Sequence, residues 1–148
     1  SYAYIGDVVY ELLARTSLLY PLKKTADYHD VVVRKVRAEE QSRLMKRIIE
    51  SDLGLASRQV DAAIPFLPLL PHEHAVLKRG RNCVKSQPSR LSGAREVYQD
   101  ATSLECLVGY LYLENCEGER FRMLAEWIKG EIVKGEIVKD EEGGGRNS

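Results

Sequence analysis

Apolar residues recur every three or four positions along most of this chain, which is the spacing of one face of an α-helix. The first pattern covers residues 2–19 and stops before Pro21, and the second runs from Asp27 to about Asp52. Later patterns predict helices over residues 71–79 and 94–114 and a last helix that starts near Gly118. No stretch shows the sustained alternation and turn signals of a β-strand. The chain is therefore predicted to be all-α.

One domain is predicted over residues 1–139, because 148 residues suffice for one core but not for two. Residues 51–71 form an elaborated connection in which three prolines exclude a long helix, although residues 57–64 are compatible with a short one. Gly130 and Gly135 are expected to weaken the last helix. Residues 140–148 are predicted to be a disordered tail.

The charge distribution is more informative than the formal net charge, which is zero. From Lys78 to Arg95 the chain carries several bases and no acid, and residues 80–93 are predicted to form a basic loop. Residues 114–142 carry nine acids and five bases. The basic run indicates a phosphate-bearing partner, whereas a solvated charged loop is the alternative. No apolar run is long enough to predict a membrane partner.

The cysteines give no sign of a metal site or of a disulfide framework. Cys83, Cys106 and Cys116 are odd in number, and no pair has the CxxC spacing of a zinc or redox site. They are interpreted as reduced packing or surface residues, which fits a reducing compartment.

Two acids stand in strongly apolar helical segments. Asp7 lies beside Gly6 in an apolar helix, and Glu105 is the one acid in residues 102–113. A carboxylate in such a place needs a partner, either a buried cation of the protein or a metal ion held by both acids. Spacing alone leaves the two interpretations open.

Three segments resemble the hallmark segments of Mini-ribonuclease III, and they occur in that family's order. They are Ala3-Tyr4-Ile5-Gly6-Asp7-Val8-Val9-Tyr10-Glu11, Leu77-Lys78-Arg79-Gly80-Arg81-Asn82 and Leu104-Glu105-Cys106-Leu107-Val108-Gly109-Tyr110-Leu111-Tyr112-Leu113. A weaker fourth match is Val36-Arg37-Ala38-Glu39-Glu40-Gln41. Together they cover most of the chain apart from the 51–71 connection and the tail.

This resemblance implies the helical ribonuclease III endonuclease fold, without an appended double-stranded-RNA-binding domain, assembled as a homodimer. Asp7 and Glu105 match the family's catalytic, metal-binding carboxylates. They imply a Mg²⁺ cofactor, which Mn²⁺ can replace, and products with 5′-phosphate and 3′-hydroxyl ends. The longer ribonucleases III carry further acids where this chain has Ala3 and Thr102, so Glu11, Asp100 and Thr102 are accessory candidates.

The resemblance also gives the basic run a role in binding double-stranded RNA. Phosphates would be neutralised, and the backbone hydrogen-bonded, by side chains of the second hallmark segment and the residues after it: Lys78, Arg79, Arg81, Asn82 and Lys85. Gln41 is a further candidate for a contact with RNA or with the partner helix.

The leading hypothesis is a Mg²⁺-dependent endoribonuclease that cuts structured RNA, which the resemblance ties to large-subunit ribosomal RNA maturation. The alternative is a catalytically silent RNA-binding component of an organelle ribosome or of its assembly intermediate. The enlarged connection and the acidic C-terminal residues would suit a protein that docks on a ribosomal particle. A plain helical interaction module ranks last, because it leaves both isolated acids and the basic run without a role. The expected compartment is the bacterial cytoplasm or a plastid or mitochondrial matrix. The inserted connection favours an organelle.

Overall fold

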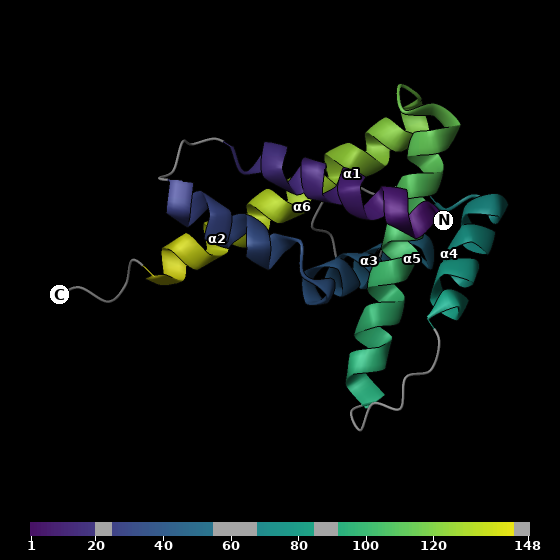
Figure 1. Ribbon diagram of the computed structural model, residues 1–148, viewed down its shortest axis with the longest axis horizontal. Coiled ribbons are helices and arrows are strands. Elements are labelled where there is room, and N and C mark those ends of the chain that lie inside the picture. Colours follow the sequence, from purple (N-terminus) through teal and green to yellow (C-terminus); the bar gives the residue numbers. More distant parts are fainter. Residues whose placement is uncertain (20–24, 55–67, 85–91, 144–148) are drawn as a thin grey trace.

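A computed structural model describes residues 1–19, 25–54, 68–84 and 92–143, with the backbone alone for residues 25, 26, 92 and 136–143 (Figure 1). Within these ranges the chain forms helices and no strand, which confirms the all-α prediction. The helices are α1 (Tyr2–Ser17), α2 (Thr25–Lys35), α3 (Ala38–Asp52), α4 (Pro71–Cys83), α5 (Ser92–Asn115) and α6 (Glu119–Gly143). No helix in the described part combines the length and hydrophobicity needed to span a membrane.

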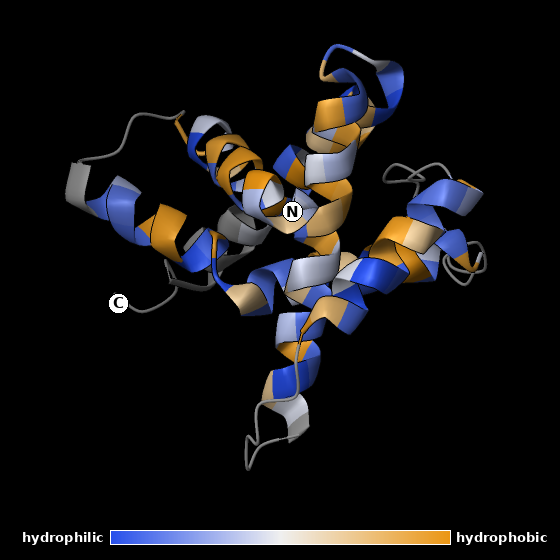
Figure 2. Cartoon of the chain, turned by 45° about the vertical axis from the view of Figure 1, so that its right-hand side comes forward, coloured by the Kyte–Doolittle hydropathy of each residue, from blue (hydrophilic) through white to orange (hydrophobic). Residues whose placement is uncertain are grey.

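Helix α5 is the central element of the fold. It contacts α1, α3, α4 and α6, and Figure 1 shows it in green, crossing the purple α1 and lying beside the teal α4. Leu104 and Leu107 of α5 are fully buried, as are Leu44 of α3 and Leu124 and Ile128 of α6. Hydrophobic and hydrophilic residues interleave along each helix (Figure 2), so every helix has an apolar face for this shared core.

Helices α1 and α5 cross at backbone distance because each has a glycine at the crossing. A Cβ added to Gly6 would lie 1.7 Å from the carbonyl oxygen of Glu105. A Cβ added to Gly109 would lie 2.1 Å from the carbonyl oxygen of Tyr2. No larger residue fits at either position without separating the two helices, so the pair of glycines fixes the contact between α1 and α5.

The prediction of one helix from Asp27 to Asp52 is wrong, because the chain breaks between α2 and α3 at residues 36–37. At the break, backbone carbonyl groups at the end of α2 lose their partners within the helix. Two buried side chains supply the missing hydrogen-bond donors. The hydroxyl of Tyr10 donates to the carbonyl of Lys35 at 3.0 Å, and Nε2 of Gln41 donates to the carbonyl of Val36 at 3.3 Å. These tertiary contacts stabilise a break that no proline or glycine marks in the sequence.

Helix α4 begins at Pro71 as predicted but continues to Cys83, so the predicted end at Arg79 is wrong. Gly80 does not end the helix; it lets α4 approach α5. A Cβ at Gly80 would lie 3.0 Å from Sγ of Cys106 and from Cα of Ser103. Residues 80–83, predicted as the start of the basic loop, are therefore helical.

The C-terminal helix α6 is longer than predicted. It passes through Gly130 and Gly135 without interruption and ends at Gly143, so residues 140–143 of the predicted disordered tail are helical. Residues 144–148 lie outside the described residues, as do residues 57–64 of the connection. The described ends of that connection meet where the backbone N–H of Leu69 donates to Oδ1 of Asp52 at 2.7 Å.

We expect Gly6→Ala to lower the free energy of unfolding by about 3 kcal/mol or more, because the new methyl group meets backbone that no rotamer change can move. Gly130→Ala is the matched control, since a Cβ there has no neighbour within 4 Å, and it should stabilise α6 by about 0.5–1 kcal/mol. Urea denaturation followed by circular dichroism measures both. Equal stability of the Gly6→Ala variant and the wild type would mean that α1 and α5 do not cross this closely.

Candidate metal centre

The glycine crossing brings together the two acids that the sequence singles out. Asp7 directly follows Gly6 on α1, and the backbone of Glu105 on α5 is the group that Gly6 faces. Asp7 is exposed and Glu105 is half-buried, so the pair is accessible from solvent. The contact between the helices therefore also sets the distance between the carboxylates.

Glu105 has an unusual electrostatic environment. Burial raises its pKa from 4.5 to about 7, and the neighbouring negative charge of Asp7 adds to the shift. The side-chain amide of Gln41 acts in the opposite direction, since a hydrogen bond to the carboxylate lowers the pKa of Glu105. Without a bound cation, a substantial part of the Glu105 population is therefore protonated near neutral pH.

The fully buried acids are treated differently from Glu105. Within the described residues, each of them is neutralised by at least one arginine. The pairs are Asp100 with Arg81, Glu73 with Arg120, and Glu131 with Arg43 and Arg47. The strongest charge effect on Glu105 comes instead from a second acid. Two adjacent carboxylates are stable together when Glu105 keeps its proton or when a cation neutralises them.

The donor set of Asp7 and Glu105 fits a hard divalent cation. Such ions prefer carboxylate oxygens and keep several waters, so two protein ligands at an accessible site suffice. Among the residues that the structure describes, no group of three or more His, Cys, Asp or Glu side chains is arranged to hold a metal. Water and substrate oxygens would therefore complete the coordination.

The accessory candidates have different positions. Oε1 of Glu11 accepts from Nε of Arg15 at 2.9 Å, one turn further along α1. Thr102 is half-buried on α5, one turn before Glu105. Asp100 uses both oxygens inside the protein, because Ser42 donates to Oδ2 at 2.9 Å and Arg81 to Oδ1 at 2.5 Å. Asp100 therefore has structural partners on both oxygens, and its accessory role at the metal site stays a prediction.

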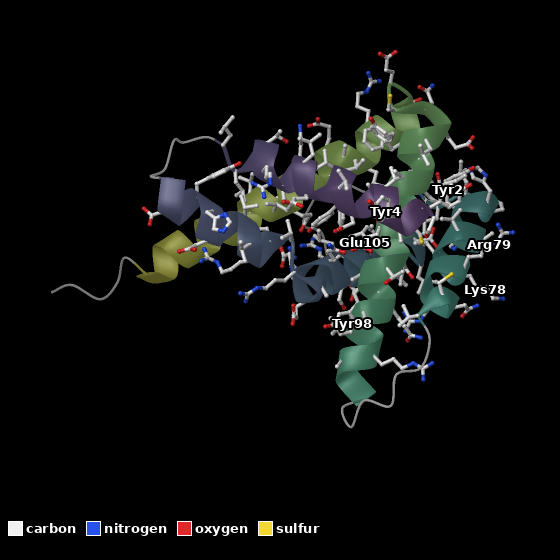
Figure 3. The ribbon with its side chains drawn as sticks, in the orientation of Figure 1. Tyr2, Tyr4, Lys78, Arg79, Tyr98 and Glu105 are labelled. Carbon is white, nitrogen blue, oxygen red and sulfur yellow. The ribbon has the colours of Figure 1, made fainter. Side chains whose placement is uncertain are left out.

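The basic residues also separate into two groups. Arg81 is half-buried and ties α4 to α5 through Asp100, and its role as a phosphate contact stays a prediction. Lys78, Arg79 and Asn82 are exposed on α4, and Lys85 lies outside the described residues. Figure 3 shows Lys78 and Arg79 on the outer side of α4, whereas Glu105 lies toward the other side of α5. Within one protomer these bases and the acid pair do not form one cluster.

Sequence reasoning missed an apolar ridge beside the acids. Tyr4, Val8 and Leu12 follow one another at intervals of one helical turn on α1, and Tyr4 is 77% exposed. The opposite face of α1 enters the core through Val9, Tyr10 and Leu13. The available signal was that α1 is apolar on two faces, one more than a single core requires.

Comparisons with known proteins show which family the chain matches. Residues 1–115 match the family described as Ribonuclease III domain. A Mini-ribonuclease 3 from a Synechococcus species is 38% identical over 127 residues, which cover 85% of this chain and 76% of that protein. The Mini-ribonuclease 3 of Thermosynechococcus vestitus is 36% identical over 132 residues, covering 88% of this chain and 75% of that protein.

The fold is also similar to that of a solved protein. A crystal structure of a Fusobacterium nucleatum protein superposes with a TM-score of 0.62 at 28% sequence identity. The alignment covers 88% of this chain and 90% of the other. The similarity therefore extends over most of the helical scaffold that carries Asp7 and Glu105.

The pKa of Glu105 predicts a pH dependence of stability for the protein in EDTA. The unfolded carboxyl releases its proton near pH 4.5 and the native one near pH 7, so wild-type stability is lost as the pH rises through this window. Glu105→Gln cannot ionise. We expect it to match the wild type at pH 5 and to exceed it by about 1–2 kcal/mol at pH 8, allowing for solvent screening.

Urea midpoints at the two pH values measure this effect. Glu126→Gln removes an exposed acid of α6 and is the control for the loss of one negative charge. A wild type that stays as stable as Glu105→Gln at pH 8 would contradict the burial of Glu105 beside Asp7.

Proposed function

Because this chain belongs to the ribonuclease III family of metal-dependent endoribonucleases, we propose that it hydrolyses double-stranded RNA at a Mg²⁺ site formed by Asp7 and Glu105. The observation that carries this proposal is the pair of neighbouring carboxylates, held by the crossing of α1 and α5, whose acid Glu105 has no counter-charge among the described residues. Mn²⁺ has similar ligand preferences and is proposed to replace Mg²⁺.

Asp7 and Glu105 would both bind the cation, but they differ in burial and in their protonation before it binds. Glu105 must release its proton before both of its oxygens can serve as anionic ligands, and its raised pKa makes this release part of metal binding. Asp7 is the more exposed of the two and can be approached by a phosphate from solvent. When bound, the cation supplies Lewis-acid stabilisation of the phosphate and activation of a water. The proposed products carry 5′-phosphate and 3′-hydroxyl ends.

Substrate binding is assigned to Lys78 and Arg79, with Asn82 beside them on α4. Exposed cations neutralise phosphates without reading the base sequence, which suits an A-form duplex whose deep groove side chains cannot enter. Lys78 and Arg79 lie on the outer side of α4 and Glu105 toward the other side of α5 (Figure 3), so they would hold the duplex at a point other than the cleaved bond.

A homodimer is proposed to form on the apolar ridge of Tyr4, Val8 and Leu12. Large exposed apolar side chains in a continuous row favour burial against a partner, and a second copy presents the same row. Asp7 lies between Tyr4 and Val8 in sequence, so this interface would place the acids at its edge. Two acid pairs in one dimer would suit the two strands of a duplex.

The proposed biological substrate is large-subunit ribosomal RNA, and the proposed compartment is a bacterial cytoplasm or an organelle matrix. The similarity to several Mini-ribonuclease 3 proteins supports the choice of a small nuclease of structured RNA. The long connection between α3 and α4 favours the organelle.

Substitutions of two neighbouring arginines of α4 are expected to have different effects, one on RNA binding and the other on stability. Arg79→Met should reduce the slope of the logarithm of the duplex-binding constant against the logarithm of the salt concentration by about one unit. It should change the unfolding free energy by less than about 0.5 kcal/mol. Arg81→Met leaves Asp100 buried with less compensation, so it should cost about 2 kcal/mol of stability and keep the salt slope. Filter binding across salt concentrations and urea denaturation test this pair. The reverse assignment would show that Arg81 contacts the RNA.

Cleavage of a labelled RNA duplex by the purified protein in Mg²⁺ or Mn²⁺ tests the main proposal. We expect cuts that EDTA abolishes, and a loss of rate of about 1,000-fold or more in Asp7→Asn and Glu105→Gln, as expected when several kcal/mol from the cation are lost. Both variants should still bind the duplex. Glu126→Gln on α6 should cleave like the wild type.

Two results would replace the proposal. Duplex binding without cleavage in either metal would favour the silent RNA-binding component. Absence of binding at low salt would favour a helical protein-interaction module.

A further inference from the structure

Gln41 is a buried polar side chain next to the acid pair. It lies in the first turn of α3, is 2% exposed, and its amide interacts with the carboxylate of Glu105. Its Nε2 also donates to the carbonyl of Val36 at 3.3 Å. A single amide group therefore connects the break between α2 and α3 with Glu105 on α5.

The orientation of this amide is determined by its two neighbours. The carbonyl of Val36 and the carboxylate of Glu105 are both acceptors, so the NH₂ group must face them. The opposite orientation would place Oε1 against the carbonyl oxygen of Val36 and remove the donor that this carbonyl now has. Oε1 of Gln41 is therefore the amide atom that neither Val36 nor Glu105 engages.

Oε1 of Gln41 is buried and accepts a hydrogen bond from no group in the described part of the chain. Buried polar atoms are nearly always satisfied, so such an acceptor indicates a donor that is not among the described residues. A divalent cation between the carboxylates would bring one, because the waters that it retains are strong hydrogen-bond donors. These waters would lie beside Glu105, within the reach of the same amide.

We propose that Gln41 is a positioning residue of the metal centre, whose NH₂ group orients the carboxylate of Glu105 and whose Oε1 accepts from the hydration shell of the cation. This inference rests on the proposed metal site and adds a third side chain to it. Hydrogen-bond partners outside the direct ligands orient those ligands and influence metal affinity strongly. The site thus has two anionic ligands and one neutral group that is fixed by the core.

Mn²⁺ titration followed by the paramagnetic resonance signal of the free ion measures affinity without using catalysis. Gln41→Met keeps the length of the side chain and removes both polar atoms, so it should weaken Mn²⁺ binding by about 10- to 100-fold. Ser42→Ala is the matched control, because Ser42 is the next residue of α3, is also buried, and donates to Asp100 instead. It should keep the Mn²⁺ affinity within about twofold.

A second variant separates positioning from a purely structural role. Gln41→Glu keeps an acceptor at this position and loses the donors to Val36 and Glu105. Because it keeps the acceptor but loses the donor that orients Glu105, it should bind Mn²⁺ less tightly than the wild type and more tightly than Gln41→Met at pH 8. Equal losses of affinity in Gln41→Met and Gln41→Glu, with both folded by circular dichroism, would overturn the proposal. Unchanged Mn²⁺ affinity in Gln41→Met would overturn it as well.

Duplex binding in EDTA completes the test. The proposal expects Gln41→Met to bind the duplex like the wild type, whereas weaker binding with normal Mn²⁺ affinity would make Gln41 an RNA contact and overturn it. The outcome is distinguishable from a failure of the proposed nuclease. A wild type that binds Mn²⁺ without cutting RNA would contradict the nuclease alone, and a wild type that binds no Mn²⁺ would contradict both.

Discussion

The backbone contact between α1 and α5 is the constraint on which the rest of the structure depends. Gly6 and Gly109 allow these helices to touch without intervening side chains, and α5 then carries the contacts to α3, α4 and α6. Asp7 and Glu105 lie within a turn of these glycines on their respective helices. The main chain therefore sets how far apart the two backbone positions that carry the acids lie.

The charges inside the protein follow two rules. Where an acid only supports the fold, an arginine from another helix neutralises it, as Arg81 does for Asp100 and Arg120 for Glu73. At the glycine crossing the rule is reversed, and Glu105 has an acid as its charged neighbour. The charged neighbour of each carboxylate thus distinguishes structural carboxylates, which pair with arginine, from carboxylates that can bind a cation.

The sequence predicts the helical class, the family and the start of α4, because these depend on apolar spacing, motif order and proline. It does not predict features that are created by contacts between distant segments. The break after α2 depends on the hydroxyl of Tyr10, and Gly80 reads as a helix end although it is a packing site. Arg81 shares a basic run with Arg79, and only the position of Asp100 shows that the two differ.

Asp7 and Glu105, which form no ion pair with another described residue, have a consequence for the evolution of this scaffold. The helices do not need Asp7 and Glu105 to assemble, since the glycines, the apolar core and the arginine pairs hold them. A lineage released from selection for catalysis would thus lose these carboxylates early and keep its shape, because drift at those two positions relieves electrostatic tension. Descendants with an intact fold and no nuclease chemistry are the expected product of such drift. They would remain suited to a purely structural role in which duplex RNA is bound and not cut.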